Sequence, residues 1–207
     1  MRRRHCPDAS PSAGLSMTLH LDAKSTALVL IDLQRGIVTR DTKPHTAGDV
    51  VTRSAKLAKR FRETGASVVL VHVGYSADDA DRLKPQTDAP PAITLPLPPD
   101  WSELVSDLEQ TPSDIVVLKR QWGAFYGTQL DLQLRRRNVQ TIVIGGIATN
   151  FGVESTARDA WERNYQLVFA EDAMASMSAE WHEFSIKNIF PRIGIVRSTD
   201  EILGALQ

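Results

Sequence analysis

Six apolar runs of strand length recur along the chain, and each is rich in valine and isoleucine. The runs are TALVLID (26–32), SVVLVHV (67–73), DIVVLK (114–119), TIVIGG (141–146), QLVFAED (166–172) and RIGIVRS (192–198). They are apolar on both faces, which is typical of parallel strands that are buried between two layers of helices. The pattern therefore predicts six strands in one mainly parallel sheet.

Helical periodicity fills most of the segments between these runs. From Val50 to Thr64 the apolar positions fall on one helical face, and Gly65 is a favourable C-terminal stop. Ser198 and Glu201 have the spacing of a capping box that begins the last helix. Further helices are expected over residues 128–137, 151–163 and 178–190, the last of which Pro191 ends. Strands that alternate with helices predict an α/β protein with a three-layer α/β/α, Rossmann-like fold.

One long segment departs from this alternation. Residues 75–113 hold seven of the eleven prolines and separate the second strand from the third. A short helix is expected within WSELVSDLE (101–109). Such a long excursion is usually a functional loop or a contact with a partner. Two roles are open for it: it covers an active site, or it embraces a second subunit.

Length and composition indicate one ordinary globular domain. The chain has 207 residues, of which 42% are hydrophobic and 24% are charged. We assign residues 17–207 to this domain and residues 1–16 to a flexible N-terminal tail, for which an arginine-rich transit peptide is the alternative. The net charge of −1 gives no general attraction to nucleic acid or membrane, and no apolar run reaches the roughly 18 residues of a membrane span. Cys6 is the single cysteine, so no internal disulfide is possible, and we expect a cytoplasmic protein.

Candidate chemistry lies where three of the strands end. In open parallel sheets ligands bind beyond the carboxyl ends of the strands, where Asp32, Lys119 and the turn GGIATN (145–150) follow apolar runs. A carboxylate or an ammonium group is costly to bury unless it is paired, so we expect Asp32 and Lys119 to meet. A structural ion pair, or two separate strand ends in solvent, is the alternative.

The GGIATN turn adds backbone donors to this edge. Its amides and the start of the next helix form a natural site for an anion or an oxyanion. Gly152 lies in the first turn of that helix, where glycine is unfavourable, and this indicates a close contact. The glycine spacing matches neither a dinucleotide fingerprint nor a phosphate-binding P-loop.

Other polar and aromatic candidates are less specific. His72 ends the second strand and either reaches the site or packs as a hydrogen-bonded core histidine. The aromatic side chains after Lys119, including Trp122 and Phe125, either wall a pocket or pack in the core. No spacing of histidine, cysteine or acidic residues indicates a metal site, so we predict no metal and no cofactor.

These residues together resemble a known family. From about Lys24 to its end the chain is similar to the isochorismatase-like hydrolases, also called cysteine hydrolases. The resemblance rests on ALVLIDLQ, on the lysine that ends the third strand, on the F-x-x-T-x-L that follows, and on G-x-A-T-x-x-[C/G]-V-x-x-T-A-x-D-A. The chain looks most similar to a bacterial branch that shares KRQWGAFYGT and the glycine at position 152.

The resemblance implies roles for the residues at the strand ends. Amidases of the family use an Asp–Lys–Cys triad, whose positions match Asp32, Lys119 and Gly152. It also implies a cis peptide between Ile147 and Ala148, with the backbone amides of Ala148 and Gly152 as the oxyanion hole. Because glycine has no thiol, the usual cysteine-dependent amidase mechanism is excluded.

The true isochorismatases of the family also carry glycine at this position. They cleave a vinyl ether by protonating its methylene carbon and then adding water, which needs no nucleophilic side chain. Asp32 would be the general acid, with its proton affinity set by burial and by Lys119. Their turn reads G-V-Y-A-H-x-G-C, however. Here Thr149 and Asn150 replace the alanine and histidine, so the resemblance does not identify the substrate. The aspartate–x–histidine of the family's zinc-binding amidases is absent from this sequence.

Three functional hypotheses follow. The first is a hydrolase that acts on a small carboxylated or vinyl-ether substrate and uses Asp32 and Lys119 without a covalent intermediate. Its substrate pocket would be lined by Gln34, His72, Trp122, Phe125, Thr149 and Asn150. The second is a non-catalytic or ligand-sensing member that keeps the cleft. The third is a nucleotide-binding domain in which Glu171 or Asp172 contacts a ribose. We expect a homodimer or homotetramer whose partner is a small molecule.

Overall fold

The computed structural model describes residues 19–89, 93 and 95–207, so the predicted tail at residues 1–16 lies outside the described residues. Six strands form one sheet in the order β3-β2-β1-β4-β5-β6, and every neighbouring pair is parallel. The strands are β1 (Thr26–Ile31), β2 (Ser67–Val73), β3 (Ile115–Lys119), β4 (Thr141–Ile147), β5 (Gln166–Ala175) and β6 (Ile195–Arg197). This arrangement confirms the predicted α/β fold.

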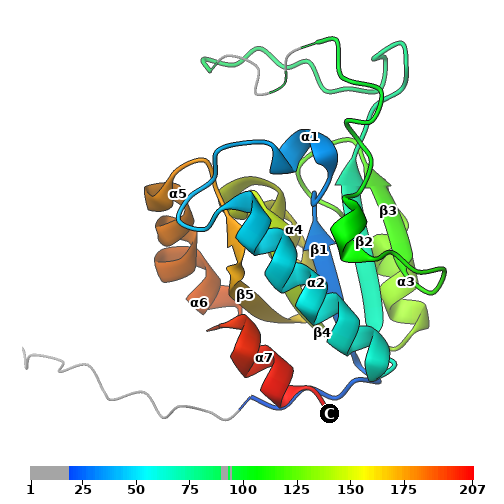
Figure 1. The fold of residues 1–207 in the computed structure, drawn as a ribbon, viewed down its shortest axis with the longest axis vertical. Coiled ribbons are helices and arrows are strands. Elements are labelled where there is room, and N and C mark those ends of the chain that lie inside the picture. Colours follow the sequence, from blue (N-terminus) through cyan, green and yellow to red (C-terminus); the bar gives the residue numbers. More distant parts are fainter. Residues whose placement is uncertain (1–18, 90–92, 94) are drawn as a thin grey trace, which may run out of the picture.

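Helices cover both faces of the sheet (Figure 1). The α-helices are α1 (Arg35–Val38), α2 (Ala47–Glu63), α3 (Leu130–Arg136), α4 (Glu154–Glu162), α5 (Ala179–Phe184), α6 (Phe190–Ile193) and α7 (Thr199–Ala205). A 3₁₀ turn, η1 (Ser106–Leu108), and two π-helical turns, η2 (Thr149–Val153) and η3 (Ser185–Ile189), complete the described elements. None of the described helices has the length and apolar character needed to cross a membrane.

Two apolar clusters, one on each face, hold the three layers together. On the first face α2 and α7 pack against the sheet, with Leu57 and Phe61 of α2 fully buried. On the second face α3, α4 and α6 pack against alternate residues of the same strands. The side chains of β1 divide between the clusters, because Leu28 and Leu30 belong to the first and Val29 to the second. The central strands are therefore apolar on both faces, as their sequence predicts.

The local signals of the sequence account for several element ends. Gly65 follows α2 with a φ of 78°, a left-handed conformation that glycine adopts without steric cost. The capping box at Ser198 is present, since its hydroxyl accepts from the Glu201 amide and the Glu201 carboxylate accepts from the Ser198 amide. The expectation that Pro191 ends a helix is wrong. Pro191 lies in the first turn of α6, where the missing N–H has no partner to lose, and the strand begins only at Ile195.

The proline-rich segment contains little regular structure. Within WSELVSDLE only the 3₁₀ turn η1 forms, and Leu108 of this turn is buried against the first apolar cluster. Trp101 is also buried, at 7% exposure. The described residues that follow β2 run outward from the body of the protein before the chain returns to η1 (Figure 1). The second half of the excursion therefore packs on the domain.

Candidate active site

Asp32 and Lys119 meet at the carboxyl edge of the sheet. Lys119 Nζ donates to Asp32 Oδ2 at 2.7 Å and to the Gln121 carbonyl at 3.0 Å. The two side chains are 9% and 2% exposed, so the ion pair is almost wholly removed from water. They come from strands that are not neighbours, because β2 lies between β1 and β3. The structure thus brings together two charges that lie 87 residues apart in the sequence.

The backbone at Asp32 adopts a left-handed conformation. Its φ is 54°, which is uncommon for a residue other than glycine, although aspartate tolerates it better than most. The Asp32 amide still donates to the Val71 carbonyl at 2.8 Å, so the turn is tied to β2. Gly146 of β4 packs directly against Ile31, the residue before Asp32. A Cβ at position 146 would lie 2.1 Å from the Ile31 carbonyl oxygen. Only glycine allows β4 to approach β1 so closely here.

One oxygen of the Asp32 carboxyl group is left without a partner. Asp32 Oδ1 is buried and has no hydrogen-bond partner among the described residues, whereas Oδ2 is held by Lys119. Burial raises the pKa of Asp32 above its ordinary value, while the charge and hydrogen bond of Lys119 and the charge of His72 oppose this rise. A carboxyl group in such surroundings is suited to carry and release a proton.

Gly152 lies against this carboxylate. A Cβ at position 152 would lie 2.9 Å from Ile31 Cγ2 and 3.1 Å from Asp32 Oδ2. Gly152 is part of η2, which begins one residue after the peptide bond between Ile147 and Ala148, and that bond is cis. Gly152 matches the nucleophilic cysteine of the family's amidases, and the structure places it in contact with Asp32. Even the smallest side chain would press on the carboxylate.

Thr149 and Asn150 open η2 and are both held by other side chains. Thr149 is fully buried, and its hydroxyl lies 2.8 Å from His182 Nδ1. Asn150 accepts a hydrogen bond through Oδ1 from the hydroxyl of Ser176, which follows β5. Both side chains therefore fix the turn that carries Gly152.

Gln34 has a supporting position in the structure. It is fully buried, and its side-chain amide donates to the Val73 carbonyl at 2.9 Å and to the Trp101 carbonyl at 3.1 Å. Its side-chain carbonyl accepts from the Val73 amide at 2.7 Å. Gln34 thus ties β1 to the end of β2 and to the proline-rich segment.

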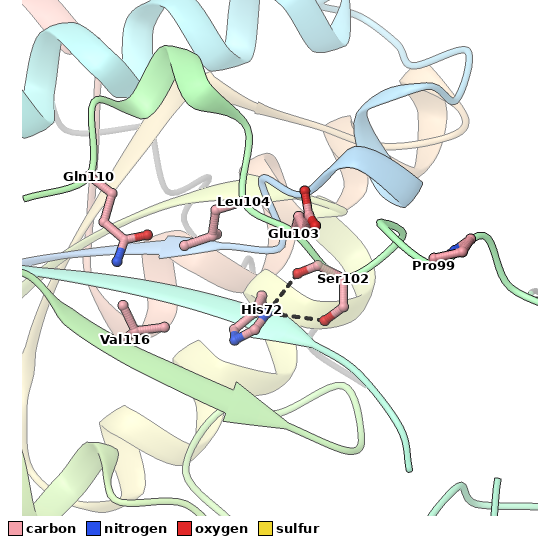
Figure 2. Close-up of a pocket in the computed structure, with 7 residues that line it drawn as sticks. All are labelled: His72, Pro99, Ser102, Glu103, Leu104, Gln110 and Val116. Atoms are coloured by element: carbon pink, nitrogen blue, oxygen red, sulfur yellow. Dashed lines mark hydrogen bonds between the residues drawn. The ribbon is translucent and has the colours of Figure 1, made fainter. Parts of the chain in front are cut away.

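His72 lies on the opposite face of the sheet from Lys119. In the register of β2 and β3, His72 pairs with Leu118 and Val73 with Lys119, and side chains alternate along a strand. Figure 2 shows His72 contacting Ser102, with Nδ1 2.7 Å from the carbonyl oxygen and 3.1 Å from the hydroxyl. It lines a depression of about 410 Å³ beside the proline-rich segment. Neither Asp32 nor Lys119 lines this depression, although the charge of His72 acts on Asp32.

The aromatic candidates divide between core and surface. Phe125 is 4% exposed and packs against Tyr165, whereas Trp122 is 62% exposed and contacts the ring of Phe151 at 4.9 Å. The sequence analysis missed Tyr75, which stacks on Trp101 and whose pKa is raised mainly by burial. Its position two residues beyond β2, at the carboxyl edge, is the signal that would have identified it.

Comparison with known proteins places these features in a family. Residues 26–201 match the family described as Isochorismatase domain. The chain is 57% identical over 188 residues to the isochorismatase family protein YecD of Escherichia coli O157:H7, covering 91% of this chain and all of YecD. It is also 30% identical to the ureidoacrylate amidohydrolase RutB of Methylorubrum extorquens, over 89% of this chain and 84% of RutB.

A solved structure shows the same architecture. An isochorismatase family protein from Burkholderia thailandensis superposes with a TM-score of 0.87 at 46% sequence identity. The superposition covers 91% of this chain and 98% of that protein. The two proteins therefore share one fold over most of their length.

Proposed function

The chain belongs to the isochorismatase domain family of hydrolases, and we propose that it cleaves a small carboxylated or vinyl-ether substrate by general acid catalysis from Asp32. The observation that carries this proposal is that the two oxygens of the Asp32 carboxyl group have different surroundings. Oδ2 is held by Lys119, whereas Oδ1 is buried and has no partner among the described residues. A protonated Oδ1 can donate to a substrate atom, and Lys119 then stabilises the carboxylate that remains.

The chemistry of a vinyl ether suits this arrangement. Transfer of the Asp32 proton to the methylene carbon leaves an oxocarbenium ion, to which water adds. The added water gives one of its protons to the Asp32 carboxylate, and the neutral hemiketal breaks down to the ketone and the alcohol. The barrier lies in the first proton transfer, and the raised pKa of Asp32 increases the fraction of the carboxyl group that carries the proton to be transferred. The amides of Ala148 and Gly152 are our proposed donors to a substrate oxygen.

A covalent amidase mechanism fits this chain poorly. RutB is named an amidohydrolase, but position 152 of this chain is a glycine, which offers no nucleophile. A thiol introduced there would also press on its neighbours, because a Cβ would lie 3.1 Å from Asp32 Oδ2. We therefore propose a reaction without a covalent intermediate.

The proposal is tested by activity on a panel of vinyl ethers, amides and esters, beginning with isochorismate. We expect turnover of a vinyl ether, and Asp32→Asn should reduce it by at least about 10²- to 10⁴-fold, the usual contribution of a general acid. Asp22→Asn is the matched control, since Asp22 is exposed and precedes the opposite end of β1. Equal activity of the Asp32→Asn and wild-type proteins would refute the role of Asp32.

The second candidate function is a non-catalytic member that senses a ligand. The depression beside His72, lined also by Ser102 and Glu103, supports it because it offers a place for a small molecule that neither Asp32 nor Lys119 lines (Figure 2). No turnover across the panel, combined with tight binding of one member, would establish this function instead.

A homo-oligomer also remains a prediction. Large apolar side chains stand exposed on the described surface, namely Trp122, Tyr126, Trp161, Trp181 and Phe184. Exposed aromatic residues are enriched at interfaces. Light scattering after size-exclusion chromatography should give a dimeric or tetrameric mass, and a mass near 22.9 kDa would contradict this.

A further inference from the structure

Three side chains with metal-binding chemistry meet outside the Asp32–Lys119 pair. His45 precedes α2, Glu171 lies in β5 and His182 lies in α5, and one ligand atom of each lies within 4.8 Å of the others. The described ion pairs of Glu171 involve these two histidines. The cluster is invisible in the sequence, since His45 and Glu171 are 126 residues apart.

The spacing of the cluster suits ligands of one ion. His45 Nε2 and His182 Nε2 lie 3.3 Å and 3.2 Å from the same atom, Glu171 Oε1. A charge-assisted hydrogen bond to a carboxylate is shorter, roughly 2.7–2.9 Å. Metal–ligand distances of 2.0–2.2 Å place neighbouring ligands of a tetrahedral ion roughly 3.3–3.5 Å apart. Two of the three ligand–ligand distances therefore already have the coordination value.

The remaining distance requires only a local movement. One ring nitrogen of each histidine lies within 4.8 Å of the other's, so the two need to approach by about 1.5 Å at most to reach the same spacing. His45 lies in the loop before α2 and its side chain is 24% exposed, whereas His182 is buried in α5. We expect His45 to make this movement.

A fourth residue orients the buried histidine. Thr149 Oγ1 lies 2.8 Å from His182 Nδ1, and the hydroxyl can accept the Nδ1 hydrogen. The Nε2 lone pair then points to the ion, in the arrangement by which outer partners fix metal-binding histidines. The opposite tautomer gives a purely hydrogen-bonded network, in which Nε2 donates to Glu171 and no metal binds.

We propose that His45, Glu171 and His182 bind one divalent transition-metal ion and that Thr149 orients the ring of His182. Two imidazoles and one carboxylate are a donor set that Zn²⁺ accepts, and three protein ligands leave a fourth position open. Glu171 is 34% exposed, so solvent reaches this position. The ion anchors Thr149, and through it the turn that carries Gly152.

The test uses the full chain in a Cys6→Ser background, because a free thiol can bind Zn²⁺ independently of the proposed site. After treatment with a chelator, equilibrium dialysis against Zn²⁺ should give one ion per chain, and Co²⁺ should give the intense visible absorption of a tetrahedral site. His45→Ala and Glu171→Gln should each weaken Zn²⁺ binding by at least about 100-fold, and Thr149→Val by about 10-fold. His20→Ala and Glu63→Gln are matched controls at exposed positions and should bind as the parent does.

Two results would overturn the site. One is the lack of stoichiometric Zn²⁺ binding, together with a melting temperature that Zn²⁺ does not raise. The other is equal binding by His45→Ala and the parent, which would locate the ion elsewhere. The variants His45→Ala and Glu171→Gln change partly exposed residues, and circular dichroism verifies their fold. Asp32→Asn should leave Zn²⁺ binding unchanged, so failure of the metal site and failure of the proposed function are distinguishable.

Discussion

Replacing Lys119 with methionine should destabilise the protein by an amount that depends on pH. Lys119 and Asp32 are nearly inaccessible to water, and their 2.7 Å contact offsets the cost of burying both charges. Removal of one partner from a buried pair typically costs about 3–5 kcal/mol, because the other charge stays buried without compensation. We expect this loss at pH 8, where the lone carboxylate is ionised or must take a proton at a cost.

The sign of the pH dependence follows from Asp32. Burial raises its pKa in the folded protein, and the variant lacks the lysine that opposes this rise. The native state therefore binds more protons than the unfolded chain, in which the carboxyl pKa is about 3.9. The free energy of unfolding of the variant should fall as the pH rises from about 4 through the folded pKa, by up to about 1.4 kcal/mol per pH unit. The loss caused by Lys119→Met should thus be smaller at pH 5 than at pH 8.

Urea unfolding at several pH values, followed by tryptophan fluorescence, measures these free energies. Asp32→Asn/Lys119→Met is the control, since it removes the titrating carboxyl group but keeps its shape. Other ionisable groups nearby, His72 and Tyr75, remain in both proteins, and their contributions cancel in the comparison. A destabilisation by Lys119→Met that is independent of pH, or effects of the two substitutions that simply add, would refute the reasoning.

Three further substitutions test the packing around the site and the cap of the last helix. Gly152→Ala places a Cβ 3.1 Å from Asp32 Oδ2 and should cost about 1–3 kcal/mol, whereas Gly204→Ala in α7 meets open space and should not lower the melting temperature. A loss no larger at Gly152 than at Gly204 would contradict this. Gln34→Met leaves backbone groups of β2 and of the proline-rich segment unpaired, so denaturant unfolding should show a loss of about 2–5 kcal/mol; under 1 kcal/mol would mean that water replaces the amide. Ser198→Ala removes the cap of α7 and should cost about 1 kcal/mol in thermal unfolding, while an unchanged melting temperature would show the cap to be unimportant.

The sequence is informative where one physical term dominates. Buried parallel strands need apolar residues on both faces, so the six strands were predictable, and the cost of an isolated buried charge pointed to Asp32 and Lys119 meeting. Pro191 shows the limit, because a proline is a helix stop or a first-turn residue depending on where the preceding hydrogen bonds end. The facing of His72 was also undetermined, since it depends on strand register.

Contacts between distant segments were beyond sequence reasoning for a different reason. His45, Glu171 and His182 carry no local spacing signal, and only the tertiary fold brings them within one ion's reach. Gln34 was assigned to a substrate pocket, but all its hydrogen bonds go to backbone groups. A glutamine just after a strand has the same sequence signature whether its side chain binds substrate or hydrogen-bonds to the backbone.

A second, partly buried ion pair of the chain, between Arg62 and Asp114, contrasts with the pair of Asp32 and Lys119. Arg62 binds Asp114 through Nε to Oδ1 at 3.0 Å and through Nη2 to Oδ2 at 2.8 Å, and Asp114 is 1% exposed. Both of its carboxylate oxygens are thus satisfied, as a pair kept for stability requires. The Asp32 side chain is also largely buried, at 9% exposure, but it keeps one oxygen without a partner and has a left-handed backbone. Each of these features costs folding free energy, and strained or unsatisfied groups of this kind cluster at functional sites. This contrast supports our proposal that Asp32, rather than Asp114, is the carboxyl group that reacts.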